Sequence, residues 1–185
     1  ISNTSSGFRS VTASVLLSSH LSISELVMVA REDRTVASMD SETRARVEAS
    51  RAVVEHALAQ PDTMMYGVTT GYGSLSTTRI QPDDRARLSR NVILKCAVGV
   101  GEPLPRDWVR AMLLIRANSL ARGVSGGRPE IIATLVDMLN EGVTPYVPGK
   151  GSLGASGDLA PLAHIALVAT GGVDDTDDSF SGQAW

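Results

Sequence analysis

The sequence predicts a mainly α-helical fold, and three observations support that prediction. Apolar residues recur at helical spacing over most of the chain, which is typical of helices that bury one face. Proline and glycine residues separate these stretches and mark where helices begin and end. Several of the predicted helices are more apolar than a small bundle requires, so we expect them to pack against partners that this chain does not contain.

A small irregular or β element is expected near the N-terminus. Val11–Leu17 is a short β-like apolar run within a segment rich in Ser and Thr. A helix is expected next, because Ser22 or Ser24 can cap it and Glu25 would lie in its first turn. We expect this first helix to end near Arg31.

Capping residues, apolar spacing and terminating Pro or Gly residues predict the remaining helices. They are expected from Asp40–Ser41 to Gln60, from Pro82 to Cys96, from Pro105 to Leu120, from Pro129 to Gly142 and from Leu159 to Val168. Tyr66–Gly73 and Val143–Gly157 lack a helical period and are expected to be loops. We divide the chain into an N-terminal region, residues 1–79, and the start of a central helical domain, residues 80–185.

Two of these helices are expected to be buried on more than one side. The helix from Pro105 carries two apolar sets on different faces, Trp108, Met112 and Ile115 on one and Val109, Leu113 and Leu120 on the other. The last helix is apolar all round except for His164, which argues for a central position. We expect His164 to be a hydrogen-bonded core histidine rather than a catalytic group.

Composition disfavours several classes of partner. The formal net charge is −3, the basic residues are scattered and aromatic residues make up 4% of the chain, so neither nucleic acid nor an anionic membrane is an expected partner. The sequence has no apolar run of about 18 residues to cross a membrane. Its single cysteine, Cys96, cannot form an internal disulfide. We expect a cytoplasmic location by default.

No metal site is expected from the sequence. Its histidines and its single cysteine are separated and show no metal-ligand spacing. The acidic cluster between Asp174 and Asp178 is expected to be a solvated loop. Because the sequence opens at Ile1 without a Met and stops at Trp185 just past this polar stretch, we expect a fragment of a longer protein.

The most informative segment is Gly151–Leu162, with the sequence GSLGASGDLAPL. The neighbouring Gly149-Lys150-Gly151 fails the phosphate-loop pattern, because Gly rather than Ser or Thr follows the lysine. A nucleophile elbow would need Gly where Asp158 stands, and no predicted strand precedes it. Since Ala-Ser-Gly is a common tripeptide, the simplest interpretation of it alone is a turn that leads into a helix capped by Asp158.

The longer segment resembles, along its whole length, the signature of the histidine, phenylalanine and tyrosine ammonia-lyases and the related 2,3-aminomutases. In that family an Ala-Ser-Gly triad, here Ala155, Ser156 and Gly157, cyclises by itself into 4-methylidene-imidazol-5-one, without a metal. The residue types suit this chemistry. The glycine supplies an unhindered amide nitrogen to attack the alanine carbonyl, and only glycine bends so tightly at low cost. The serine then loses water and leaves an electrophilic methylidene carbon.

A second motif, Tyr66–Gly73, resembles the family's mobile loop, whose tyrosine acts as a base. Alone it would be a surface turn with an exposed tyrosine, but the two motifs stand in the family's order, and the resemblance extends loosely over residues 21–171. It implies that Tyr66 removes a substrate proton. Because a phenol in water has a pKa of about 10, the site must stabilise the phenolate. It also implies the N-terminal portion of a large helical ammonia-lyase-type fold, and a homotetramer that builds each site from several subunits.

The same resemblance implies further contacts with the substrate, from Gly73, Lys95, Cys96 and Leu153. In the family, two adjacent residues just beyond an Asn, here Asn91, select the substrate side chain. Histidine and tyrosine enzymes usually have a His in this pair, and many phenylalanine enzymes have an aromatic–aliphatic pair, whereas this chain has Lys95-Cys96. Lys95 either extends away from the pocket, with Cys96 in the core, or reaches a polar or anionic group of the substrate.

The resemblance implies a carbon–nitrogen lyase that eliminates ammonia from an aromatic or related L-α-amino acid, its small-molecule partner. A 2,3-aminomutase that uses the same chemistry is the alternative within enzymes, and a relative that never cyclises its triad is the alternative outside them. A serine hydrolase is disfavoured by Asp158. Other site residues of the family, including the arginine that pairs with the substrate carboxylate, are expected beyond Trp185, so this chain alone is expected to be inactive.

Overall fold

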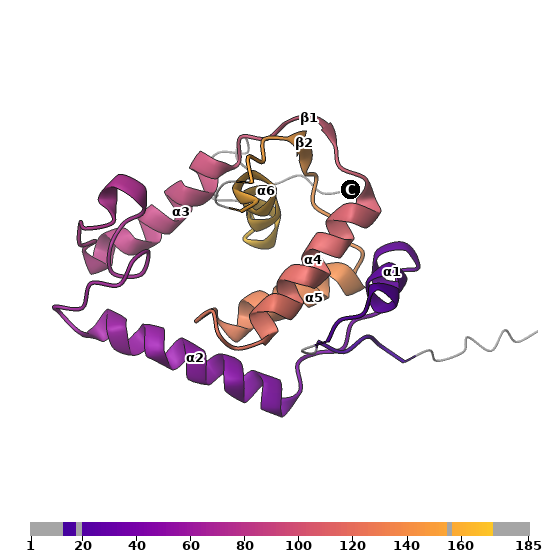
Figure 1. The fold of residues 1–185 in the computed structure, drawn as a ribbon, viewed down its shortest axis with the longest axis horizontal. Helices are drawn as coiled ribbons and strands as arrows, with labels where there is room; N and C mark the ends of the chain where they lie inside the picture. Colours follow the sequence, from indigo (N-terminus) through magenta and orange to yellow (C-terminus); the bar gives the residue numbers. More distant parts are fainter. Residues whose placement is uncertain (1–12, 18–19, 155–156, 172–185) are drawn as a thin grey trace, which may run out of the picture.

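A computed structural model describes residues 13–17, 20–154 and 157–171 of the protein. Within these ranges the chain is mainly helical, as predicted, with a small two-stranded sheet (Figure 1). The elements in chain order are α1 (Ile23–Arg31), α2 (Ser41–Ala59), the 3₁₀ turns η1 (Gly73–Leu75) and η2 (Pro82–Asp84), α3 (Arg85–Cys96), β1 (Val100–Pro103), α4 (Arg106–Ala121), α5 (Pro129–Asn140), β2 (Pro148–Lys150) and α6 (Leu159–Ala169).

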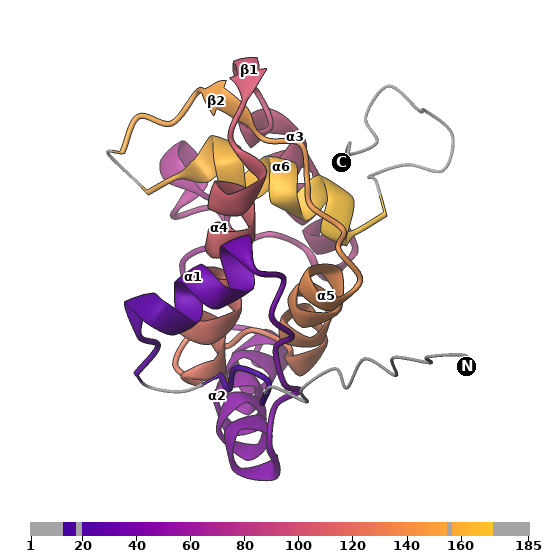
Figure 2. The ribbon, with the colours of Figure 1, turned by 90° about the vertical axis from the view of Figure 1, so that its right-hand side faces the viewer.

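Helices α4 and α5 pack side by side, and α1 packs on α4 (Figure 2). Helix α2 runs along one end of this pair, while α3 and α6 pack against each other (Figure 1). The main core lies between α4, α5 and α1, where Val109, Leu113, Leu114, Ile132 and Val29 are at most 1% exposed. Each such side chain contributes roughly 1.5–3 kcal/mol of transfer free energy.

The predicted starts of the first two helices are confirmed by their caps. Ser22 caps α1: its hydroxyl accepts from the Glu25 N–H at 3.2 Å, and the Glu25 carboxylate accepts from the Ser22 N–H at 2.8 Å. Asp40 caps α2 by accepting from the Thr43 N–H at 2.6 Å. Both caps satisfy backbone donors that have no partner within the helix.

The two-stranded sheet was not predicted. Strands β1 and β2 pair antiparallel, with Val100 opposite Lys150 and Pro103 opposite Pro148, and the register is irregular between these pairs. Both strands are short, contain Gly and Pro and show no alternation of apolar and polar residues, so the usual strand signal is missing. Among residues 13–17, the expected N-terminal β element is represented by one parallel bridge between Val15 and Val36.

The two apolar faces of helix α4 differ in how far this chain buries them. The set with Val109 and Leu113 is buried, as expected. On the other face, Trp108 is 57% exposed and Ile115 is 48% exposed. The described part of the chain therefore covers the Val109 face and leaves Trp108 and Ile115 largely uncovered, so burial of this second face stays a prediction for partners outside the chain.

A buried arginine ties three segments together. Arg110 of α4 is 1% exposed, and its guanidinium donates to the carbonyl of Val29 in α1, at 2.9 and 3.1 Å, and to that of Leu139 in α5 at 3.1 Å. The same group lies 3.1 Å from the Asp33 carboxylate, just beyond α1. Burial lowers the pKa of Arg110 from its usual value, and the Asp33 charge opposes that shift.

Candidate functional site

The loop around Tyr66 is held together by its own polar groups; residues 63–80 are called the tyrosine loop below. The carbonyl of Met65 accepts from the N–H groups of Val68, Thr69 and Thr70 at 3.0–3.2 Å. Thr69 is fully buried, and its hydroxyl donates to the Thr63 carbonyl at 2.7 Å and accepts from the Met65 N–H at 2.8 Å. The loop predicted at Tyr66–Gly73 is thus confirmed, and it is a compact structure.

Tyr66 stands at the surface of this loop and is 63% exposed. Its hydroxyl accepts a hydrogen bond from the Gly73 N–H at 3.4 Å, so two of the residues singled out in the sequence lie together. Tyr72 packs edge to face on the Tyr66 ring. The phenol of Tyr66 is therefore oriented by its neighbours while it remains accessible from solvent.

The segment that carries the triad is closed at its base; residues 151–158 are called the triad loop. Gly154 and Gly157 pair in an antiparallel bridge, and both have a positive φ, +72° and +83°. Ala155 and Ser156, between them, lie outside the described residues. The Ser152 hydroxyl donates to the Asp158 carboxylate at 2.5 Å, which joins the two ends of the loop.

Asp158 occupies the N-cap position of α6 but makes no side-chain cap hydrogen bond. The interpretation of Asp158 as a side-chain cap of α6 is therefore wrong, because its carboxylate accepts a hydrogen bond from Ser152 and none from the backbone of the first helical turn. Leu153, expected to contact substrate, is 94% exposed in the chain on its own. A Cβ atom added at Gly154 or Gly157 would meet nothing within 4 Å, so open space surrounds the loop at these two positions.

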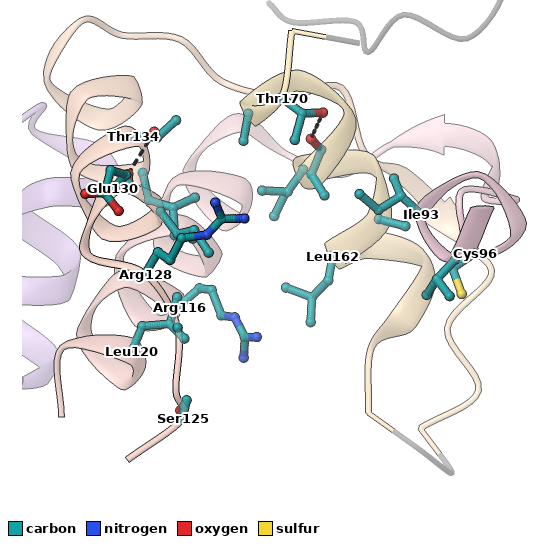
Figure 3. Close-up of a pocket in the computed structure, with 18 of the residues that line it drawn as sticks. Ile93, Cys96, Arg116, Leu120, Ser125, Arg128, Glu130, Thr134, Leu162 and Thr170 are labelled. Atoms are coloured by element: carbon teal, nitrogen blue, oxygen red, sulfur yellow. Dashed lines mark hydrogen bonds between the residues drawn. The ribbon is translucent and has the colours of Figure 1, made fainter. Parts of the chain in front are cut away.

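Cys96 and Lys95 lie on different sides of α3. Cys96 is half-buried and lines an apolar cavity of about 700 Å³ between α3, α4, α5 and α6, whereas Lys95 is exposed and is not part of that lining. Figure 3 shows Ile93 and Cys96 of α3 across from Leu162 of α6, with Arg116 and Arg128 on another wall. The cavity thus brings one residue of the predicted selectivity pair against the helix that follows the triad.

His164 of α6 is a hydrogen-bonded histidine, as predicted. Its Nε2 atom accepts from the Gly99 N–H at 3.1 Å, so this nitrogen carries no proton and the ring is neutral. Burial lowers the pKa of His164, which favours the same neutral form. The sequence indicated a core histidine but not its partner, which lies 65 residues away in the chain.

Among the described residues, no group of three or more His, Cys, Asp or Glu side chains is placed to hold a metal ion. The acidic cluster between Asp174 and Asp178 lies outside the described residues. No helix in the described ranges is both long and apolar enough to cross a membrane.

Comparison with known proteins gives a consistent result. The sequence model of the aromatic amino acid lyase family matches residues 21–179. Over 151 residues the chain is 49% identical to a histidine ammonia-lyase of Alkaliphilus metalliredigens, which covers 82% of this chain and 29% of that protein. The chain therefore spans less than a third of this curated relative.

Solved structures agree. The ergothioneine-degrading ergothionase of Treponema denticola matches with a TM-score of 0.82 and 30% identity, over 94% of this chain and 34% of that one. A tyrosine aminomutase from Streptomyces globisporus matches with a TM-score of 0.78 and 32% identity, over 94% of this chain and 35% of that one. Both are similar to this chain over nearly its whole length and differ from each other in the reaction that their names state.

Proposed function

The chain belongs to the aromatic amino acid lyase family, and from this premise we propose that the whole protein eliminates ammonia from an aromatic or related L-α-amino acid. The observation that supports this most directly is that one chain contains both loops whose sequences resemble those of the family. One presents an oriented tyrosine, and in the other a bridge between Gly154 and Gly157 joins the residues on either side of Ala155 and Ser156.

The triad loop has properties that suit formation of the imidazolone. Cyclisation needs a sharply bent backbone, and the positive φ at Gly154 and Gly157 is a conformation that residues with a Cβ rarely adopt. The Gly154–Gly157 bridge and the Ser152–Asp158 hydrogen bond draw the two arms of the loop together. We therefore propose Ala155, Ser156 and Gly157 as the source of 4-methylidene-imidazol-5-one, which supplies an electrophile for the substrate's α-amine.

Tyr66 is the proposed base that removes the β-proton. A base must reach the substrate, and the exposed phenol of Tyr66 can do so. It must also carry negative charge when it is ready to act, and the Gly73 N–H is a donor directed at the phenol oxygen. Gly73 therefore acts on the base, in addition to the substrate contact expected of it from the sequence.

The choice of substrate is proposed to depend on Lys95 and Cys96. Cys96 lines a cavity beside α6, and Lys95 is free to extend along the surface of α3. The sequence relatives favour histidine as the first substrate to test, because several curated relatives that are 48–51% identical to this chain are named histidine ammonia-lyases. The Lys-Cys pair also favours testing an amino acid with a polar distal group, because the exposed ammonium group of Lys95 is a hydrogen-bond donor next to Cys96.

A 2,3-aminomutase is the second candidate, because the chain is similar in structure to a tyrosine aminomutase. One experiment separates the two. The full-length protein is incubated with L-histidine, L-tyrosine and L-phenylalanine, and ammonia, the unsaturated acid and the β-amino acid are each quantified. Ammonia with unsaturated acid supports the lyase, and a β-amino acid as the main product supports the mutase. A triad peptide without a mass deficit of two waters would show that the imidazolone never forms.

The full-length protein is further proposed to be a cytoplasmic homotetramer. The exposed apolar side chains of Trp108 and Ile115 on α4 and Ile131 on α5 are suited to burial in a larger assembly. Light scattering of the full-length protein would test this directly, since a monomer would contradict it.

A further inference from the structure

We propose that His164 is a positioning residue that holds Cys96 in place relative to the triad loop and thereby affects which amino acid is accepted. This inference rests on the proposed function of the two loops. The proposed function assigns no role to His164. The inference follows from the close contact of three segments: the residues after α3, the start of the triad loop and helix α6. The junction consists of Gly99, Gly151, Ala160 and His164 and is called the Gly99 joint below.

The hydrogen bond between Gly99 and His164 is the first part of the joint. Gly99 lies between α3 and β1, and its N–H donates to His164 Nε2 at 3.1 Å. The two groups are in direct contact, because a Cβ atom added at Gly99 would lie 2.9 Å from His164 Nε2 and 3.1 Å from the Cβ of Pro148. Glycine is therefore required at position 99 for the hydrogen bond to His164 to keep its observed length.

The second part of the joint brings in the triad loop. A Cβ atom added at Gly151 would lie 3.1 Å from the Cα of Gly99 and 3.3 Å from the Cβ of Ala160. Ala160 and His164 are four residues apart in α6 and so lie on the same face of that helix. The first residue of the triad loop, the segment after α3 and one face of α6 therefore meet at one place.

Cys96 is linked to this joint by a tight turn. The N–H of Val98 donates to the carbonyl of Cys96 at 2.9 Å, and the N–H of Ala97 donates to that of Ile93 at the end of α3. Few free torsions separate Cys96 from Gly99, so a restraint on Gly99 also restrains Cys96. His164 lies seven residues beyond Gly157 in chain order, within the same helix that leaves the triad loop.

The chemistry of the imidazole suits this role. A neutral His164 with its proton on the other nitrogen offers Nε2 as an acceptor, and burial favours that neutral form. Loss of the acceptor would leave the Gly99 N–H unsatisfied in a half-buried position, which is costly. The segment after α3 would then move away from α6, and Cys96 would move with it.

The test compares full-length variants. His164→Leu removes the acceptor and keeps an apolar volume, whereas His164→Gln retains an acceptor oxygen close to the position of Nε2. Leu167→Val is the matched control, because Leu167 is a buried residue of α6 that is neither in the joint nor in the cavity lining. Three quantities are measured: hydrogen exchange at Gly99, the alkylation rate of Cys96 followed by peptide mass spectrometry, and kcat and KM for histidine, tyrosine and phenylalanine.

For His164→Leu, we expect exchange at Gly99 and alkylation of Cys96 to rise roughly two- to tenfold, the factor that one ordinary hydrogen bond is worth. We also expect the ratio of kcat/KM between the two best substrates to change by about tenfold, mainly through KM, with the imidazolone absorbance retained. His164→Gln and Leu167→Val should stay within about twofold of the parent in all three measurements.

Unchanged exchange and alkylation in His164→Leu would overturn the proposal, whatever the enzyme does. If exchange at Gly99 and alkylation of Cys96 both rise but substrate preference does not change, His164 holds Cys96 in place without affecting which amino acid is accepted, and that part of the proposal would be overturned. A full-length parent that forms no imidazolone and converts no amino acid would refute the proposed function instead, while exchange and alkylation would still decide whether His164 holds Cys96 in place.

Discussion

The ring of Tyr72 meets the ring of Tyr66 edge to face, with 5.9 Å between the ring centroids and 85° between the ring planes. The hydroxyl of Tyr72 donates to the carbonyl of Gly67 at 3.1 Å, so the packing ring is itself fixed at its far end. Tyr66 is thus held on one side by an aromatic contact and at its oxygen by the Gly73 N–H. The two tyrosines of the loop have different roles, and this difference can be tested.

Tyr66→Phe is expected to lower kcat by at least about 100-fold, the low end of what a positioned base contributes. The aromatic contact with Tyr72 is kept, and the imidazolone absorbance should not change. Tyr72→Phe is the matched control, because it removes a hydroxyl from the same loop and should cost no more than about threefold. Steady-state kinetics of the full-length protein would measure both. A Tyr66→Phe rate close to that of the parent would exclude Tyr66 as the base.

Ser156→Ala is expected to abolish turnover, because alanine has no hydroxyl to lose in forming the methylidene carbon. A small residue replaces another in a loop, so the unfolding temperature should change little. The triad peptide of the variant should also lack the mass deficit of two waters. Activity similar to that of the parent would contradict the proposed chemistry as a whole.

Lys95→Phe is expected to shift substrate preference toward phenylalanine by about 1–3 kcal/mol of transition-state discrimination, the usual scale for one pocket contact. The variant is assayed against phenylalanine, tyrosine and an acidic amino acid. Cys96→Ala is the companion variant, because Cys96 lines the cavity and Lys95 does not. If only Cys96→Ala changes the ratios of kcat/KM, Lys95 does not contact the substrate side chain.

The helices were predictable because their signals are local. The Ser22 capping box and the Pro129 start of α5 are set by residues within one turn of each other. The β1–β2 sheet was not predictable, since its strands lie more than 40 residues apart and neither has a strand pattern of its own.

The same distinction holds in the site. The Tyr66–Gly73 contact lies within one loop that the sequence had already singled out. The Gly99–His164 bond joins distant segments, and the spacing of residues carries no information about such a pairing. Sequence also could not show that Cys96 faces the cavity while Lys95 does not, because this depends on where α6 packs against α3.

Arg110→Met is expected to destabilise the protein by about 3 kcal/mol, because the buried carbonyls of Val29 and Leu139 would lose their donor. Arg106→Met is the matched control. Arg106 also lies 3.1 Å from the Asp33 carboxylate, but it is exposed, so its loss should cost less than about 1 kcal/mol. Urea unfolding would compare the two. An equal loss of unfolding free energy in the two variants would show that the contribution of Arg110 to stability does not depend on its burial.

Stability is expected to fall as the pH drops below the ordinary histidine pKa of 6.5. The pKa of His164 is lowered in the folded protein, so between that value and 6.5 the unfolded chain binds more protons and acid favours unfolding. The stabilisation is complete above 6.5, and its slope cannot exceed about 1.4 kcal/mol per pH unit for one proton. His164→Gln should remove this part of the slope in thermal unfolding, and an unchanged slope would exclude His164 as its source.

The hydrogen bonds of the tyrosine loop also join its two ends. Arg79, near the end of the loop, donates to the carbonyl of Thr63 at its start, at 3.1 Å, and to that of Gln60 just before the loop, at 3.2 Å. These two hydrogen bonds hold the beginning and the end of the loop close together, and Thr69 and Thr70 are buried within the loop. Tyr66 and the Gly73 N–H that donates to it therefore belong to one internally hydrogen-bonded unit, so a change in the position of this unit carries the phenol and its donor together.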